Sequence, residues 1–201
     1  MKKLLYLHGF GSSGSSGTVE ILRKEFLGTG AENRVQVIAP DIPVDPAEAL
    51  PFIKGLAEKE QPNLIVGTSM GAMYAQQLHG FERICVNPCF AISKKYDILF
   101  VGKHKWLNRR KDGATEFHVT KQIIGHFAEM EERQFDGIDE VDQIFCHGLF
   151  GDEDDMCKCW IEEFERHYPG MSRTFQGGHR MNADIVRRVL IPFIRELKAF
   201  G

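Results

Sequence analysis

The chain has 201 residues, of which 43% are hydrophobic and 26% are charged, the proportions of a globular protein and not of a disordered one. Its net charge of −3 argues against a protein dominated by contacts with nucleic-acid phosphates. No apolar run approaches the roughly 18 residues of a membrane span, and five cysteines are too sparse for a secreted disulfide scaffold. We expect a single cytoplasmic domain over residues 1–201 that binds neither nucleic acid nor membrane, with its oligomeric state left open.

Short apolar runs recur along the chain and predict strands. Several are apolar at consecutive positions instead of alternating, which is typical of strands covered on both faces. The runs are 3–7 (KLLYL), 35–39 (VQVIA), 63–67 (NLIVG), 83–87 (RICVN), 143–147 (QIFCH) and 172–176 (SRTFQ).

Helical patterns lie between these runs. Apolar residues repeat at helical spacing in 19–26, 50–57, 72–80, 160–168 and 186–197. Asp45 and Pro46 supply a helix cap and a proline at the first helical position, and Pro192 predicts a kink in the last helix. Strands alternating with helices indicate an α/β fold, with about six mostly parallel strands and helices on both faces.

One interval is about 30 residues longer than a single strand–helix–strand unit needs, namely the stretch between the runs at 83–87 and 143–147. We predict an insertion over 90–142 that forms a lid at the carboxyl edge of the sheet. Its charges are segregated, with a basic stretch at 94–111 and an acidic one at 129–142. Helical spacing of Ile123, Phe127 and Met130 predicts a lid helix, and Trp106 and Phe127 are candidate substrate-pocket residues.

The strongest chemical signal is Gly67-Thr68-Ser69-Met70-Gly71, which follows an apolar run and precedes a helical pattern. G-x-S-x-G at a strand-to-helix turn is the nucleophile elbow, because the turn is so tight that the residues two positions before and after the serine approach one another and must lack side chains. The turn exposes the hydroxyl group at a helix N-terminus, where negative charge is stabilised. We predict Ser69 as the nucleophile.

A serine nucleophile needs a base, and the base needs an orienting carboxylate. In a fold of this kind these groups follow later strands in the order Ser, Asp, His. His179 comes after the last predicted strand and a glycine pair, so it is the candidate base. Asp152, just after Gly151, is the candidate acid, and Asp154 is the second choice.

Acyl transfer also needs an oxyanion hole. One donor is the N–H of the residue after the nucleophile, and the other comes from the loop after the first strand. These are Met70 and, in His8-Gly9-Phe10-Gly11, Phe10.

The segments LYLHGFGSS, GTSMGAMYAQ, VNP, FGDED and GGHR together resemble the YqiA-like esterase family of small α/β-hydrolases. The likeness covers most of the chain outside 94–142. The resemblance implies an α/β-hydrolase fold and hydrolysis of small carboxylic esters by a Ser-His-Asp triad, with Asn87-Pro88 as a structural turn near the site.

Other functions remain open. The basic stretch 94–111 could contact an anionic group such as a coenzyme A phosphate, so a thioesterase of acyl-CoA-like substrates is one alternative. An acyltransferase and a catalytically silent binding protein of the same fold are others. The acids at 152–155 lie near Cys157 and Cys159, but this spacing matches neither zinc nor calcium motifs, so we expect no metal and no cofactor.

Overall fold

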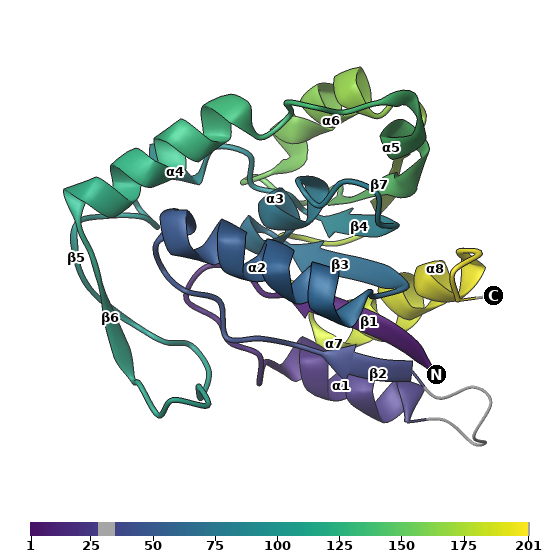
Figure 1. Cartoon of the computed structure of the whole chain (residues 1–201), viewed down its shortest axis with the longest axis horizontal. Coiled ribbons are helices and arrows are strands. Elements are labelled where there is room, and N and C mark those ends of the chain that lie inside the picture. The colour runs from purple at the N-terminus through teal and green to yellow at the C-terminus, as the bar shows by residue number, and fades with distance from the viewer. Residues whose placement is uncertain (28–34, 201) are drawn as a thin grey trace.

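The computed structural model describes residues 1–27 and 35–200. Six strands form one sheet in the order β2-β1-β3-β4-β7-β8, and every neighbouring pair is parallel (Figure 1). The strands are β1 (Lys2–Leu7), β2 (Val35–Ile38), β3 (Leu64–Thr68), β4 (Arg83–Val86), β7 (Cys146–Gly151) and β8 (Ser172–Phe175). The predicted mostly parallel α/β architecture is confirmed.

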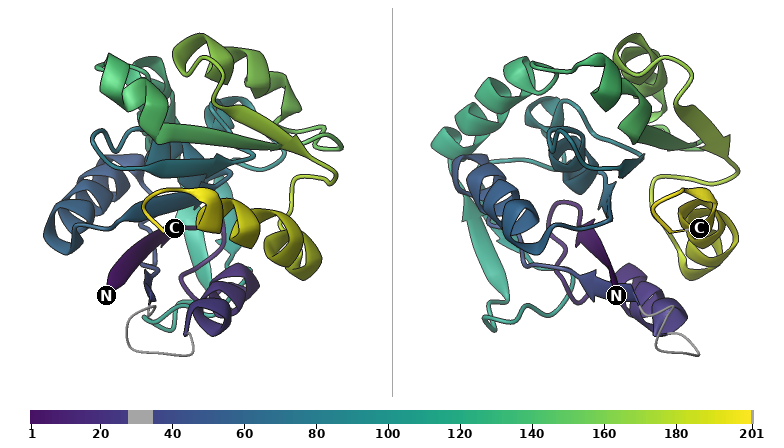
Figure 2. Two further views of the ribbon diagram at one scale, coloured as in Figure 1. Left: turned by 90° about the vertical axis from the view of Figure 1, so that its right-hand side faces the viewer. Right: turned by 45° about the vertical axis from the view of Figure 1, so that its right-hand side comes forward.

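Helices cover both faces of the sheet, and each face has its own hydrophobic core (Figure 2). Side chains of β1 alternate between the two cores, with Leu5 and Leu7 on one face and Leu4 and Tyr6 on the other. The first core packs beneath α2, α3, α4 and α6, and the second beneath α1 and the C-terminal helices. The helices are α1 (Gly17–Phe26), α2 (Pro46–Glu60), α3 (Met70–Gln76), α4 (Lys121–Arg133), α5 (Glu140–Phe145), α6 (Ile161–His167), α7 (Ala183–Ile185) and α8 (Ile191–Glu196).

The predicted start of α2 is confirmed in detail, because the Asp45 carboxylate accepts a hydrogen bond from the Ala47 N–H and Pro46 is the first helical residue. The helix α3 is shorter than the sequence predicts, since it ends at Gln76 and not next to Gly80. In the C-terminal region, a π-helical turn, η4 (Val186–Leu190), directly precedes α8, and Pro192 lies in the first turn of α8. Among the residues described, no helix has the length and hydropathy to cross a bilayer.

The strand predicted at 143–147 is wrong in its position. Residues up to Phe145 belong to α5, and β7 begins at Cys146. Two polar contacts explain the helix: the Asp139 carboxylate caps it by accepting from the Asp142 N–H, and the buried Arg83 guanidinium binds the Asp142 side chain. The strand therefore ends at Gly151, several residues later than predicted.

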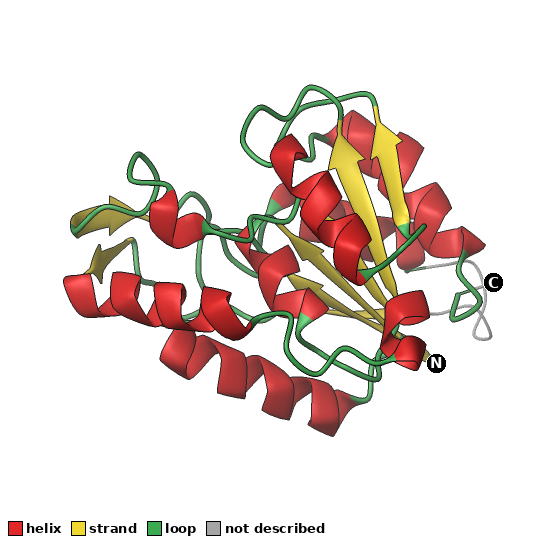
Figure 3. Ribbon diagram, turned by 90° about the horizontal axis from the view of Figure 1, so that it is seen from above, coloured by secondary structure: helices red, strands yellow, loops and turns green. Residues whose placement is uncertain are grey.

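The insertion at 90–142 contains a short 3₁₀ helix, η2 (Ile92–Lys94), an antiparallel hairpin and α4. The hairpin pairs β5 (Gly102–Lys105) with β6 (Glu116–Val119). Hairpin and α4 lie together at the end of the molecule away from the N-terminus, as Figure 1 and the view from above in Figure 3 both show. The helix predicted from the spacing of Ile123, Phe127 and Met130 is α4.

Candidate active site

Ser69 lies directly after β3 and immediately before α3, in the left-handed region of backbone space at φ 55° and ψ −118°. The glycines around it are required by close backbone approach. A Cβ atom on Gly67 would lie 2.2 Å from the carbonyl oxygen of Gly71, and one on Gly71 would lie 2.1 Å from that of Leu7. This is the tight strand-to-helix turn that the sequence motif predicts, and it holds the Ser69 hydroxyl group at the carboxyl edge of the sheet.

Three side chains form a continuous hydrogen-bonded chain at this edge. His179 Nε2 lies 3.0 Å from Ser69 Oγ, and His179 Nδ1 lies 2.8 Å from Asp154 Oδ2. A carboxylate can only accept, so Nδ1 carries the imidazole proton and Nε2 is left to accept from the serine hydroxyl group. The arrangement can therefore take a proton from Ser69 while stabilising the imidazolium that results.

The carboxylate that bonds to His179 belongs to Asp154 and not to Asp152, which corrects the first choice made from the sequence. Asp152 is exposed, and its Oδ1 accepts a hydrogen bond from the Gly177 N–H. Asp152 does not reach His179 because β7 extends to Gly151, beyond the predicted end of the strand. The Asp152 N–H still bonds to the Phe175 carbonyl oxygen, in continuation of the sheet. The chain turns only after that point, which brings Asp154 to the histidine.

Asp154 is held in place as an acceptor. Its side chain is only 1% exposed, and the second oxygen, Oδ1, accepts from the backbone N–H groups of Met156 and Cys157. Burial by itself raises the pKa of this carboxyl group, but the His179 hydrogen bond and charge together with the two N–H groups outweigh it and leave the pKa below its ordinary value. The group is thus ionised and fixed toward His179.

The loop predicted to supply the second oxyanion donor stands beside the nucleophile. A Cβ atom on Gly9 would lie 3.3 Å from Ser69 Cβ and 3.9 Å from its Oγ, so a side chain at Gly9 would crowd the hydroxyl group. Phe10 follows, with its ring packed edge-on against Phe117 at 5.4 Å between centroids. Met70 is the first residue of α3, and its N–H has no acceptor within the helix.

His8, which the sequence does not single out, anchors this loop from beneath. Its ring is 1% exposed, Nε2 accepts from the Ile42 N–H at 3.0 Å, and Nδ1 donates to the Gly9 carbonyl oxygen at 2.8 Å. Burial lowers the pKa of His8 to about 4, so the neutral ring keeps one donor and one acceptor. Its position at the end of β1 is the signal that could have identified it.

Asn87 ties two loops of the site to β4. Its Nδ2 donates to the carbonyl oxygens of Gly178 (3.1 Å) and His179 (3.0 Å), and its Oδ1 accepts from the Gly151 N–H (2.7 Å). Asn87 is buried and has a φ of 44°, a conformation that asparagine tolerates better than most residues. The loops that carry Asp154 and His179 are therefore held by one amide.

The insertion is seated on the loop next to Ser69. The Leu107 N–H donates to the Gly11 carbonyl oxygen at 2.7 Å, and the Ser13 hydroxyl group donates to the Arg109 carbonyl oxygen at 2.8 Å. Trp106 lies in this part of the hairpin, with Arg110 stacked 4.2 Å from its ring centroid.

Phe127 has a different place from the one predicted. Its side chain is 0% exposed and belongs to the first core, because the apolar face of α4 packs onto the body of the protein. A completely covered ring has no face left for a ligand, so Phe127 anchors α4 where the sequence predicts a substrate contact.

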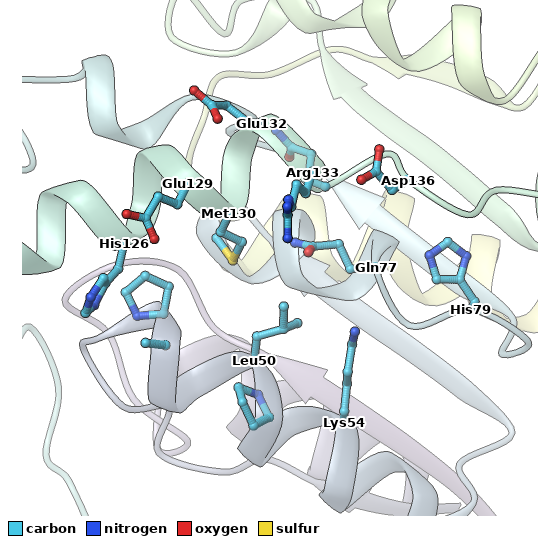
Figure 4. Close-up of a pocket in the computed structure, with 14 residues that line it drawn as sticks. Leu50, Lys54, Gln77, His79, His126, Glu129, Met130, Glu132, Arg133 and Asp136 are labelled. Carbon is cyan, nitrogen blue, oxygen red and sulfur yellow. The ribbon is translucent and has the colours of Figure 1, made fainter.

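A separate cleft of about 710 Å³ runs between α2 and α4 and is lined by residues such as Leu50, Lys54, His126 and Met130 (Figure 4). Its lining does not include Ser69, Asp154 or His179. The cleft is therefore distinct from the hydrogen-bonded chain at the carboxyl edge.

Several solved structures share this arrangement of strands and helices. Est1E from Butyrivibrio proteoclasticus has a TM-score of 0.64 at 14% identity, covering 97% of this chain and 87% of Est1E. The thioesterase domain from the curacin biosynthetic pathway has a TM-score of 0.64 at 15% identity, covering 96% and 90%. Alpha/beta hydrolase domain-containing protein 10 from mouse has a TM-score of 0.59 at 13% identity, covering 96% and 88%.

At sequence identities this low, the likeness shows a shared fold and nothing more, and that fold is the α/β-hydrolase fold. A comparison with curated proteins finds no match. Residues 3–130, which include the loop at 8–11, the turn at Ser69 and most of the insertion, match a family of uncharacterised proteins. Because the match spans more than half of the sequence, the chain belongs to the uncharacterised protein family UPF0227, as its resemblance to YqiA-like proteins implies.

Proposed function

We propose that this protein is a serine hydrolase that cleaves small carboxylic esters through an acyl-enzyme. The observation that carries the proposal is the chain of hydrogen bonds from Ser69 Oγ to His179 and on to Asp154, with distances of 3.0 and 2.8 Å. An esterase domain from a Rhodothermus marinus protein and the curacin-pathway thioesterase domain are among the structures of the same fold, which adds support.

The reaction follows from the roles of these groups. Ser69 Oγ attacks the acyl carbonyl carbon while His179 Nε2 takes its proton, and the negative oxygen that forms is stabilised by the N–H groups of Met70 and Phe10. His179 then gives the proton to the departing alkoxide, which leaves as an alcohol. Water attacks the acyl-enzyme with His179 as base again, and Ser69 is restored.

Asp154 has the role of orienting residue in this scheme. It keeps the imidazole proton on Nδ1 and stabilises the imidazolium without being protonated itself. Its burial and its two backbone hydrogen bonds support this assignment over Asp152, which is exposed and bonded to Gly177.

The insertion serves as the lid of the site in this proposal. Contacts of Leu107 with Gly11 and of Arg109 with Ser13 support it, because they place the hairpin against the oxyanion loop. A covering element of this kind excludes water and shapes the acyl pocket. Trp106, on the same hairpin, is the candidate pocket residue.

The test is hydrolysis of p-nitrophenyl acetate, butyrate and octanoate, with acetyl-coenzyme A as a thioester arm, by wild type and Ser69→Ala. We expect turnover of at least one ester and a loss on the order of 10⁴-fold in the variant. If only the thioester is hydrolysed, the protein is a thioesterase and not an esterase. A Ser69→Ala protein that remains as active as wild type would contradict the proposal.

A further inference from the structure

The thiol group of Cys157 lies close to both Asp154 and His179. The Cys157 sulfur, a carboxylate oxygen of Asp154 and a ring nitrogen of His179 all lie within 4.8 Å of one another. Cys157 is 0% exposed and its backbone N–H donates to Asp154 Oδ1 at 3.0 Å, so the thiol is fixed beside the carboxylate. The ring nitrogen that bonds to Asp154 is Nδ1.

Three donor atoms form the cluster, and a second buried thiol, that of Cys89, lies outside it. Cys89 follows β4, and its backbone N–H donates to the Ser69 carbonyl oxygen. One sulfur, one imidazole nitrogen and one carboxylate oxygen are donor types that zinc uses, and three protein ligands leave the fourth position of the metal open for water.

We propose that Cys157, His179 and Asp154 form an inhibitory binding site for Zn²⁺ or another thiophilic divalent cation. The cation would be a regulator and not a cofactor, because it occupies groups that the proposed reaction needs. The prediction that the cation binds depends only on the cluster of ligand atoms. The prediction that the cation inhibits hydrolysis rests on the proposed function.

The proton balance explains why such a cation inhibits. Zn²⁺ displaces the thiol proton of Cys157, which leaves to solvent, and takes the place of the proton on His179 Nδ1. The neutral imidazole then carries that proton on Nε2, where it faces Ser69. In this tautomer Nε2 is a donor and cannot accept the proton of the serine hydroxyl group. Removal of the metal restores the original tautomer.

Other cysteines of the chain lack these surroundings. Cys159 is exposed and lies outside the cluster, although it is only two residues from Cys157. Cys85 and Cys146 have their sulfurs 3.7 Å apart, but the buried guanidinium group of Arg83 lies close by, and its positive charge disfavours a cation. Cys159→Ala is therefore a matched control for Cys157→Ala.

The binding experiment uses Co²⁺ as a coloured probe under a phosphine reductant, in the Ser69→Ala protein so that activity plays no part. We expect one Co²⁺ per chain, displaced by Zn²⁺, with thiolate-to-metal charge-transfer absorption. Adding Cys157→Ala should abolish that absorption, and adding Cys159→Ala should leave it. Absorption that survives Cys157→Ala, or that depends on Cys159, would overturn the site.

The inhibition experiment compares each protein with its own metal-free rate of ester hydrolysis. We expect Cys157→Ala to raise the Zn²⁺ concentration for half-inhibition by about 10- to 100-fold or more, Cys159→Ala to leave it unchanged, and a chelator to restore the rate. Equal Zn²⁺ sensitivity of Cys157→Ala and wild type would overturn the proposal. If no protein hydrolyses an ester, the proposed function fails, and the Co²⁺ titration still decides the metal site.

Discussion

Asn87 and His179 are joined by a hydrogen bond of 3.0 Å from the Asn87 amide nitrogen to the His179 carbonyl oxygen. The bond fixes the backbone that carries the candidate base, while the same side chain accepts from Gly151 at the end of β7. One residue thus sets the relative position of the two loops that bring Asp154 and His179 together.

Asn87→Gly isolates this role, because glycine accepts the φ of 44° and removes only the side chain. We expect kcat for ester hydrolysis to fall on the order of 10²-fold, since small misplacement of a catalytic group costs about that much. KM should change little. Steady-state kinetics with a thermal unfolding control measure both, and a variant with wild-type kcat would contradict the positioning role.

Asp154→Asn and Asp152→Asn form a matched pair on one loop. Asparagine at 154 presents an N–H or a neutral oxygen to His179 and loses control of the tautomer, so we expect kcat to fall by on the order of 10⁴-fold. Asparagine at 152 can still accept from Gly177 and should retain most of the activity. Comparison of the two rates checks the assignment, which fails if the loss belongs to Asp152→Asn.

Much of the fold follows from the sequence because its signals are local. Apolar runs bounded by turns place five of the six sheet strands, and Asp45-Pro46 places the start of α2. The run at 143–147 fails because a short apolar run suits a buried helix as well as a strand. What decides it is the contact of Asp142 with Arg83, which lies 59 residues away in sequence.

The candidate site likewise contains residues that a local sequence motif predicts and residues whose roles depend on tertiary structure. Ser69 and the glycines beside it follow from the motif, because the tight turn is a local geometry. The choice between Asp154 and Asp152 depends on where β7 stops pairing with β8, which is a tertiary property. Phe127 belongs to the core because α4 docks through it, and helical spacing alone does not distinguish a core face from a ligand face.

His8 makes stability depend on pH in a defined window. Its pKa is about 4 in the folded protein and ordinarily 6.5, so the unfolded chain binds a proton that the folded protein does not. Stability from this group is therefore full above about pH 6.5 and falls as pH drops toward 4, by on the order of 3 kcal/mol. When the free energy of unfolding is measured with denaturant between pH 7 and pH 4, it should fall less steeply with decreasing pH in His8→Gln, which lacks the titrating ring, than in wild type. Equal slopes would contradict a neutral, buried His8.

Trp106→Ala and Phe127→Ala should have different consequences, although both residues belong to the insertion. We expect Trp106→Ala to change the ranking of acetate, butyrate and octanoate esters, because the residue lies on the hairpin next to the oxyanion loop. Phe127→Ala should instead lower the free energy of unfolding by about 3–5 kcal/mol, the cost of emptying a buried aromatic site. Ester kinetics and denaturant unfolding separate the two, and an unchanged ranking in Trp106→Ala would contradict the lid.

The most direct test of the central claim is labelling with an activated fluorophosphonate, which reacts with a serine only where a base has made it nucleophilic. Intact-mass and peptide analysis of wild type should find one phosphonyl group, on the peptide that contains Ser69. Ser69→Ala should not be labelled, and His179→Ala should be labelled far more slowly. A folded wild-type protein that takes no label, or takes it on a residue other than Ser69, would contradict the account.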